Sequence, residues 1–126
     1  MYLNRVTLIG FLGQDARSAA TQEGREVARL SLATTRRYQQ HSEWKEKTQW
    51  HDCVVYGKAA AYAAKLGKGD HVLVEGELTY REYNRTVETE SGPIRVIWPV
   101  TEVIVESISR LDRTRKATGN EPEEAA

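Results

Sequence analysis

The sequence predicts a single all-β domain with one short helix. Its 126 residues suit one hydrophobic core. Five segments show the alternating or short apolar runs that are typical of strands, and only residues 58–66 show the apolar spacing of a helix. No apolar run approaches the roughly 18–20 residues of a membrane span, and the N-terminus has no signal-peptide pattern.

The first strand is expected at residues 4–13, NRVTLIGFLG. Every second residue from Val6 to Leu12 lies on one face, which we assign to the core. The opposite face becomes apolar at Ile9 and Phe11. Because an apolar outer face is unfavourable in water, we expect a second subunit to cover it.

The second strand is expected at residues 27–35, VARLSLATT, with Ala28, Leu30 and Leu32 facing the core. The polar and charged stretch that follows, up to Thr48, predicts a long β-hairpin extension or a loop. Residues 49–56, QWHDCVVY, then form the third strand.

The predicted helix covers residues 58–66, KAAAYAAKL. The i, i+3, i+4, i+7 spacing of one helix face is occupied by Ala59, Tyr62, Ala63 and Leu66. Gly67 stands where a C-terminal cap is expected. The pattern therefore places one short helix directly after the third strand.

The fourth strand is expected within residues 71–80, HVLVEGELTY, and the fifth from Ile94 to about Ile108. The connection between them, residues 81–95, is polar and rich in charge. Pro99 favours an edge position or a bulge within the fifth strand, because proline cannot donate a ladder hydrogen bond.

Three strands, a short helix and two further strands are the element order of an oligonucleotide/oligosaccharide-binding (OB) barrel. We therefore expect a five-stranded OB-fold barrel over residues 1–109, with its helix between the third and fourth strands and a long β-hairpin extension. Apolar residues nearly vanish from Arg110 onward. Residues 110–126 are accordingly predicted to be a short, flexible and disordered tail.

The charge of the chain is balanced, with 18 basic against 18 acidic residues. Any anion-binding surface must therefore come from local segregation of charge. The single cysteine, Cys53, excludes an internal disulfide and fits a cytoplasmic protein. Its apolar neighbours indicate a buried thiol rather than a reactive one.

Aromatic residues lie beside cations at three places. Trp50 and Tyr56 have the same parity in the third strand, so their side chains point to one face, and Lys58 follows. Residues 36–38, RRY, place two arginines before a ring, and residues 81–85, REYNR, place one on each side of a ring. Rings interleaved with cations favour stacked nucleobases with bound phosphates, although aromatic residues in a strand are equally typical of a core.

Some residues argue against particular functions. Asp52 shares the face of Trp50, and Glu82 directly precedes Tyr83 in the sequence. Both carboxylates are expected to weaken phosphate binding. Adjacent strand residues point to opposite faces, so His51 and Asp52 cannot converge on Cys53 as a catalytic triad. The histidines also lack the spacing of a zinc site. We expect no enzymatic activity, no metal and no cofactor.

Four segments, in this order and spacing, resemble the bacterial single-stranded DNA-binding protein family. They are NRVTLIGFLGQD, VARLSLATT, QWHDCVVYGKAAAYAAKLGKGDHVLVEGEL and TEVIVESISRL, and the resemblance covers roughly residues 2–109. It implies a homotetramer of OB barrels that binds and protects single-stranded DNA, without strong sequence preference, during replication, recombination and repair.

The resemblance and the local patterns together define the expected site residues. The stacking residues are expected to be Tyr38, Trp50, Tyr56 and Tyr83. The phosphate ligands are expected to be Arg5, Arg36, Arg37, Lys58, Lys68, Arg81 and Arg85, and Arg29 also points away from the core. The oligomer interface is expected to include Ile9, Phe11 and His51.

The C-terminus departs from the resemblance. Members of the family typically end in a long flexible linker and an acidic tip with aromatic and proline residues that recruits replication and repair proteins. This chain ends in ATGNEPEEAA, so we expect either a truncated tail or a short paralogue, and recruitment of such partners is open. An alternative function is a primosome-type OB-fold adaptor, which binds protein partners more than DNA. An RNA-binding or cold-shock-like chaperone is less compatible with the long loops.

Overall fold

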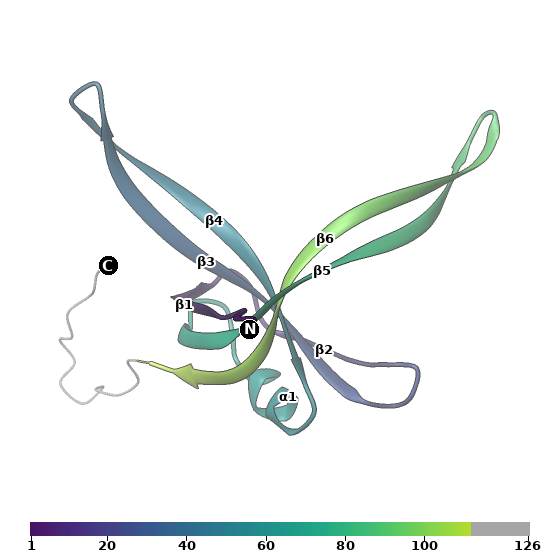
Figure 1. Ribbon diagram of the computed structural model, residues 1–126, viewed down its shortest axis with the longest axis horizontal. Helices are drawn as coiled ribbons and strands as arrows, with labels where there is room; N and C mark the ends of the chain where they lie inside the picture. Colours follow the sequence, from purple (N-terminus) through teal and green to yellow (C-terminus); the bar gives the residue numbers. More distant parts are fainter. Residues whose placement is uncertain (112–126) are drawn as a thin grey trace.

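The computed structural model describes residues 1–111 (Figure 1). Of the predicted tail, residues 110–126, Arg110 belongs to the last strand, and residues 112–126 lie outside the described residues. In chain order the elements are β1 (Val6–Leu12), β2 (Arg17–Ala20), β3 (Glu26–Gln40), β4 (Glu43–Tyr56), α1 (Lys58–Ala63), β5 (His71–Thr89) and β6 (Gly92–Arg110). The five predicted strands correspond to β1, β3, β4, β5 and β6. The predicted all-β class, with one helix after the third of these strands, is confirmed.

The strands form one sheet in the order β1-β5-β6-β4-β3-β2, and β1 also pairs with β3. This second pairing of β1 closes a barrel of five strands, and β2 lies outside it on the edge of β3. All the pairings are antiparallel except that of β4 with β6, which joins Cys53 to Val103 and Val54 to Ile104. The sequence did not predict β2, because its four residues are all exposed and show no apolar alternation.

The barrel interior holds a single cluster of buried apolar side chains. The second predicted strand buries its expected inward residues, Ala28, Leu30 and Leu32. Leu12 at the end of β1 is also buried. Gly10 lies where β1 crosses β3, and a Cβ there would overlap the carbonyl oxygen of Ala33. Glycine therefore allows the two strands to approach closely enough to close the barrel.

The helix is shorter than predicted. It ends at Ala63 and is capped by Ala64, because the next backbone N–H groups bond three residues back, Lys65 to Tyr62 and Leu66 to Ala63, at 3.1 Å. Gly67 is not the cap: its N–H donates to Asp70 Oδ2 at 2.8 Å. Within residues 1–111, no helix combines the length and the apolar character needed to cross a membrane.

The buried face of the helix also differs from the prediction. Ala60 and Ala63 are fully buried and Leu66 nearly so, whereas Tyr62 is 43% exposed. The Tyr62 hydroxyl instead accepts a hydrogen bond from the Arg110 N–H at 3.2 Å. The helix thus closes one end of the barrel with small side chains.

Two long hairpins extend from the barrel on the side away from α1 (Figure 1). The β3–β4 arm is the predicted hairpin extension, and its turn has positive φ at His41 (52°) and Ser42 (65°). The β5–β6 arm replaces the polar connection expected over residues 81–95, and its ladder runs without a break to the pair Thr89–Gly92. Pro99 lies in this arm opposite Glu82, where β6 pairs only with β5, so its expected edge position is confirmed.

Candidate nucleic-acid interface

The outer face of the barrel on β3 and β4 carries two of the predicted aromatic residues, Trp50 and Tyr56. Residues directly opposite each other in an antiparallel ladder share a face, and Ala33 is opposite Trp50, Ser31 opposite Asp52 and Val27 opposite Tyr56. The alternate residues, including Cys53 and Val55, belong to the buried core. The predicted common face of Trp50 and Tyr56 is therefore present, and it points away from the barrel interior.

Trp50 is 59% exposed, at a position where β4 pairs with β3 through Ala33 and not with β6. Its ring lies over Gly13, where an added Cβ would overlap the ring atoms. Close contact on one side restricts the ring orientation, and the remaining surface is open to solvent. Tyr56 is half-buried, and the Arg25 guanidinium lies 5.1 Å from its ring centroid.

The β5–β6 arm carries two further rings on this face. Tyr83 and Trp98 are directly opposite each other in the ladder and are 50% and 53% exposed. Arg81 is opposite Val100, and Arg85 is opposite Val96, so both arginines share the face of Tyr83. Three predicted residues are thus brought together with one tryptophan that the prediction did not include.

The β3–β4 arm divides its predicted residues between two faces. The Arg37 guanidinium lies 5.3 Å from the Trp44 ring centroid, and these residues have the parity of Ala33 and Trp50. The Arg36 guanidinium lies 5.5 Å from the Tyr38 ring centroid. Tyr38 is five residues after Ala33 in the same strand, an odd number, so Tyr38 and Arg36 lie on the opposite face.

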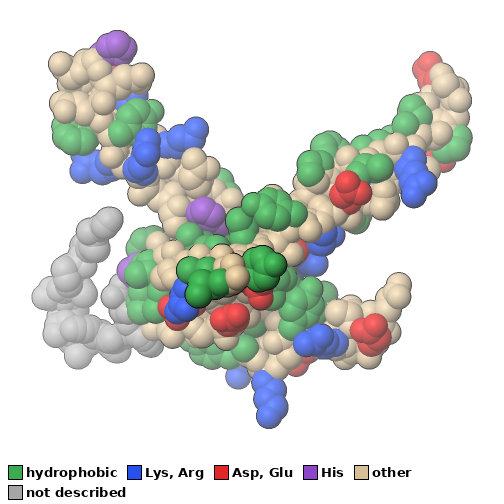
Figure 2. Space-filling model, in the orientation of Figure 1, with side chains coloured by type: hydrophobic (Ala, Val, Ile, Leu, Met, Phe, Trp, Pro, Cys, Tyr) green, Lys and Arg blue, Asp and Glu red, His purple; other side chains and the backbone are tan. Residues whose placement is uncertain are grey.

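Basic side chains are prominent on this arm. In the view of Figure 2, several Lys and Arg side chains lie along the β3–β4 arm. Residues 36–47 hold four basic residues against two acidic ones, Glu43 and Glu46, which lie 3.9 Å from Lys45 Nζ and Arg37 Nε. The arm therefore has a local excess of positive charge, which the balanced total charge requires of an anion-binding surface.

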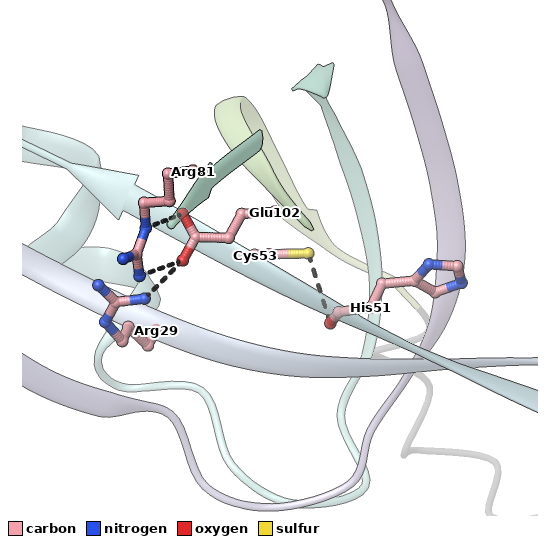
Figure 3. Close-up of polar contacts among 5 residues, drawn as sticks. All are labelled: Arg29, His51, Cys53, Arg81 and Glu102. Atoms are coloured by element: carbon pink, nitrogen blue, oxygen red, sulfur yellow. Dashed lines mark hydrogen bonds and ion pairs between the residues drawn. The ribbon is translucent and has the colours of Figure 1, made fainter. Parts of the chain in front are cut away.

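A buried carboxylate lies at the centre of the face. Glu102 of β6 is 4% exposed and is bound by two arginines from two other strands (Figure 3). Arg81 donates from Nε to Oε1 at 3.1 Å and from Nη2 to Oε2 at 3.0 Å, and Arg29 donates from Nη1 to Oε2 at 3.0 Å. These hydrogen bonds, Arg81 first, hold the pKa of the Glu102 carboxyl below its usual range, and the bond to Glu102 raises the pKa of Arg81.

Three predicted phosphate ligands lie elsewhere. Arg5 precedes β1, with Nη2 3.8 Å from a Glu75 carboxylate oxygen. Lys58 begins α1, directly after the strand that carries Tyr56. Lys68 lies in the turn before β5, where its backbone N–H donates to Asp15 Oδ1 at 2.9 Å.

The predicted interface residues of β1 are exposed in this single chain. Ile9 is 54% and Phe11 47% exposed, and the Phe11 ring stacks on His71 with centroids 4.3 Å apart. His51 is half-buried, with Nε2 2.9 Å from Thr34 Oγ1, on the side of β4 opposite Trp50. The expected divergence of His51 from Asp52 therefore holds. Within residues 1–111, no group of three or more His, Cys, Asp and Glu side chains is arranged to hold a metal.

Sequence reasoning did not select Trp44, Trp98 or Arg17. Trp44 has the same parity as Trp50 in one uninterrupted strand, so its face was predictable once residues 43–56 were taken as a strand. The positions of Trp98 and Arg17 on this face follow from their pairing with Tyr83 and Arg29, and the sequence does not give the strand register that creates these pairs.

Comparison with known proteins identifies related chains. Residues 3–111 match the family model described as the single-strand binding protein family. Over 83 residues the chain is 43% identical to the single-stranded DNA-binding proteins of Xanthomonas campestris pv. campestris and Xanthomonas axonopodis pv. citri. The aligned region is 64% of this chain and 48% and 46% of those proteins, so the match spans about half of their length.

Solved structures show the same fold. The structure of Plasmodium falciparum SSB in complex with single-stranded DNA superposes with a TM-score of 0.70 at 32% identity, covering 89% of this chain and 97% of that one. A deletion mutant of the single-stranded DNA binding protein from Thermus aquaticus superposes with a TM-score of 0.70 at 27% identity, covering 88% and 51%.

Proposed function

The chain belongs to the single-strand binding protein family, and from this premise we propose that it binds single-stranded DNA without sequence preference. We further propose that it protects such DNA in the cytoplasm during replication, recombination and repair. The role is one of binding, and we assign no catalysed reaction to it.

The observation that carries the proposal is the shared face of three predicted rings and three predicted arginines. Trp50, Tyr56 and Tyr83 point to the same outer surface as Arg37, Arg81 and Arg85. A buried aromatic core, which is the alternative reading of the sequence, would have placed these rings inside the barrel. Trp50 and Tyr83 are exposed, so ring surface is available to bases there, whereas Tyr56 is half-buried with the Arg25 guanidinium 5.1 Å from its ring centroid.

Stacking supplies affinity without reading sequence. Every base has a π-face, and one stacked base contributes about 1–3 kcal/mol. Phosphate contacts from arginine add a salt-dependent contribution that also carries no sequence information. Bases in a duplex are already stacked on each other, so this surface favours single strands.

The residues outside this face would contact a longer strand. Tyr38 and Arg36 lie on the other side of the β3–β4 arm, so we propose that they act where the strand passes around that arm. Lys58 and Lys68 would meet it at the helix end of the barrel, and Arg5 near the start of β1.

We also propose assembly into a homotetramer through the apolar face of β1. Ile9 and Phe11 expose about half of their area in the single chain, which is the surface that a second copy would cover. His51 contributes from the inner side of the arm in this proposal. An assembly of four barrels would let one strand contact several copies of the face.

Tryptophan fluorescence during titration with poly(dT) at low salt tests the function. The side chains of Trp44, Trp50 and Trp98 are 63%, 59% and 53% exposed, so stacking of bases should quench a large part of the emission. A duplex of the same length is the control and should quench little. Absence of quenching by poly(dT), with the tryptophans accessible to acrylamide, would contradict DNA binding and support the adaptor role instead.

A further inference from the structure

A polar pocket lies on the proposed binding face, where Arg29, Arg81 and Glu102 meet. Its volume is about 250 Å³, and it is lined by residues of β2, β3, β4, β5 and β6, together with Gln14. The charged residues in its lining are Arg17, Arg29, Asp52, Arg81 and Glu102. No aromatic ring lines it, so a nucleotide there would not be held by stacking.

The arginines of the pocket retain free donors. Of the five N–H donors of a guanidinium, Glu102 engages two on Arg81 and one on Arg29. Both side chains are 42% exposed, whereas Glu102 is 4% exposed beneath them. The carboxylate therefore holds two guanidinium groups from behind and leaves their remaining N–H bonds available to a ligand in the pocket.

The charges of the lining leave a small positive excess. Three arginines against two carboxylates give one net positive charge (3 − 2 = 1), which a phosphodiester would neutralise. By charge alone, a carboxylate on this surface would oppose a polyanion. Glu102 is buried and accepts three hydrogen bonds, which indicates that it fixes the orientation of the two guanidinium groups. A guanidinium that is already fixed in place loses less entropy when it binds phosphate.

We propose that Glu102 is a positioning residue for Arg29 and Arg81, and that the pocket in front of them is a subsite for one phosphate group of the bound strand. This inference rests on the proposed function, since it concerns how the same face holds single-stranded DNA. Glu102 itself does not touch the ligand.

The test uses Glu102→Gln, which removes a negative charge but keeps an acceptor for one arginine. Affinity for a dT oligonucleotide is measured by tryptophan quenching at several salt concentrations. A positioning role predicts affinity about tenfold weaker and a log–log salt slope lower by about 0.7, despite the gain in positive charge. Affinity equal to or tighter than that of the unmodified chain would overturn the proposal.

The matched control is Glu106→Gln, which removes the same charge from an exposed position of the same strand. It should bind DNA as tightly as the unmodified chain or slightly more tightly. A loss equal to that of Glu102→Gln would overturn the proposal, because the effect would then not depend on the arginines.

A second variant covers the case in which Glu102→Gln does not fold. Arg81→Lys keeps the charge but cannot form the two-pronged contact with Glu102. The proposal predicts that Arg81→Lys loses about as much affinity as Arg81→Ala, whereas a purely electrostatic role predicts affinity like that of the unmodified chain.

Affinities for oligonucleotides of dT, dC and dA show whether the pocket binds a phosphate group or a base. A phosphate subsite predicts the same proportional loss for all three, and a loss that varies with the base would overturn the assignment. Failure of the unmodified chain to bind any of them would contradict the proposed function. Normal binding with no effect of Glu102→Gln would contradict this inference alone.

Discussion

Four aromatic side chains of the proposed face, Trp44, Trp50, Tyr83 and Trp98, leave half or more of their area in water. Such exposure gives up hydrophobic stabilisation that a core position would provide. Stacking on a base would recover part of it, because the ring then leaves water on its open side. At the residue scale, we therefore expect the exposed ring area to supply much of the proposed affinity for DNA.

Replacing Trp50 with alanine should weaken binding to dT oligonucleotides by about 1–3 kcal/mol and leave the salt slope nearly unchanged. The ring contributes stacking and no charge, so only the salt-independent part of the affinity is lost. Equilibrium titrations at several salt concentrations measure both quantities. Tyr80→Ala is the control, since Tyr80 is 72% exposed on the other face of the β5–β6 arm, and it should change affinity little.

Two adjacent arginines provide a matched test of the faces. Arg37 shares the face of Trp50, and Arg36 lies opposite. With an oligonucleotide too short to pass around the arm, Arg37→Ala should lower the salt slope by about 0.7, and Arg36→Ala should lower it less. Salt titrations of both variants measure the difference. Equal effects would contradict the assignment of Arg37 to the direct path of the strand.

The pH dependence of stability should report the burial of Cys53. Burial, and secondarily the charge of Asp52, raises the pKa of the thiol from 9.0 to about 12. The unfolded chain loses this proton near pH 9 while the folded chain keeps it, so stability falls as pH rises from about 9 towards 12. The slope contributed by Cys53 approaches about 1.4 kcal/mol per pH unit.

Urea unfolding of the unmodified chain and of Cys53→Ala over this pH range isolates the contribution, because both share all other titrating groups. The alanine variant should lose less stability between pH 9 and pH 11. A parallel pH dependence in the two chains would show that the thiol is accessible in the folded state.

At the element scale, the β3–β4 arm shows how a polar segment can form regular strands. Most residues of the β3–β4 arm beyond Thr34 are exposed on both faces, so no apolar alternation marks them. Their ladder is maintained by backbone pairing that continues from the barrel, and by contacts such as Thr35 Oγ1 to Thr48 Oγ1 at 3.0 Å. The arms widen the proposed binding face without enlarging the core.

Closure of the barrel depends on the contact between β1 and β3. Gly10→Ala should destabilise the fold by about 1–3 kcal/mol, because the new Cβ must displace the Ala33 carbonyl. Chemical denaturation measures the loss. Ser18→Ala on the exposed edge strand β2 is the control and should stay within about 0.5 kcal/mol of the unmodified chain. An unchanged stability for Gly10→Ala would show that β1 can move away from β3.

At the scale of the whole molecule, the balanced charge of the chain is compatible with the proposed anion-binding surface. Its 18 basic and 18 acidic residues are distributed unevenly, with arginines on the proposed face and Glu102 buried beneath two of them. Long-range attraction is therefore weak, and binding depends on contacts at the face. The apolar face of β1 adjoins it, because Phe11 is opposite Ala33 and Ala33 is opposite Trp50, so assembly and DNA affinity are to be measured on the same variants.

Ile9→Glu should dissociate the proposed tetramer into smaller species, because it places a charge in the apolar contact between copies. Light scattering coupled to size-exclusion chromatography measures the mass. Ile94→Glu is the control, since Ile94 is similarly exposed at 49% but lies on the β5–β6 arm. A monomeric mass for the unmodified chain at micromolar concentration would contradict the proposed assembly.

The sequence by itself determined the all-β class, the five barrel strands and the inward positions of β1 and β3, because alternation of apolar residues reflects burial on one face. It also determined that Trp50 and Tyr56 share a side. Only the tertiary structure decided that Tyr83 and Trp98 join them and that Glu102 holds Arg29 and Arg81. Those relations depend on the register between strands far apart in the chain, and a shift of one residue would reverse every face.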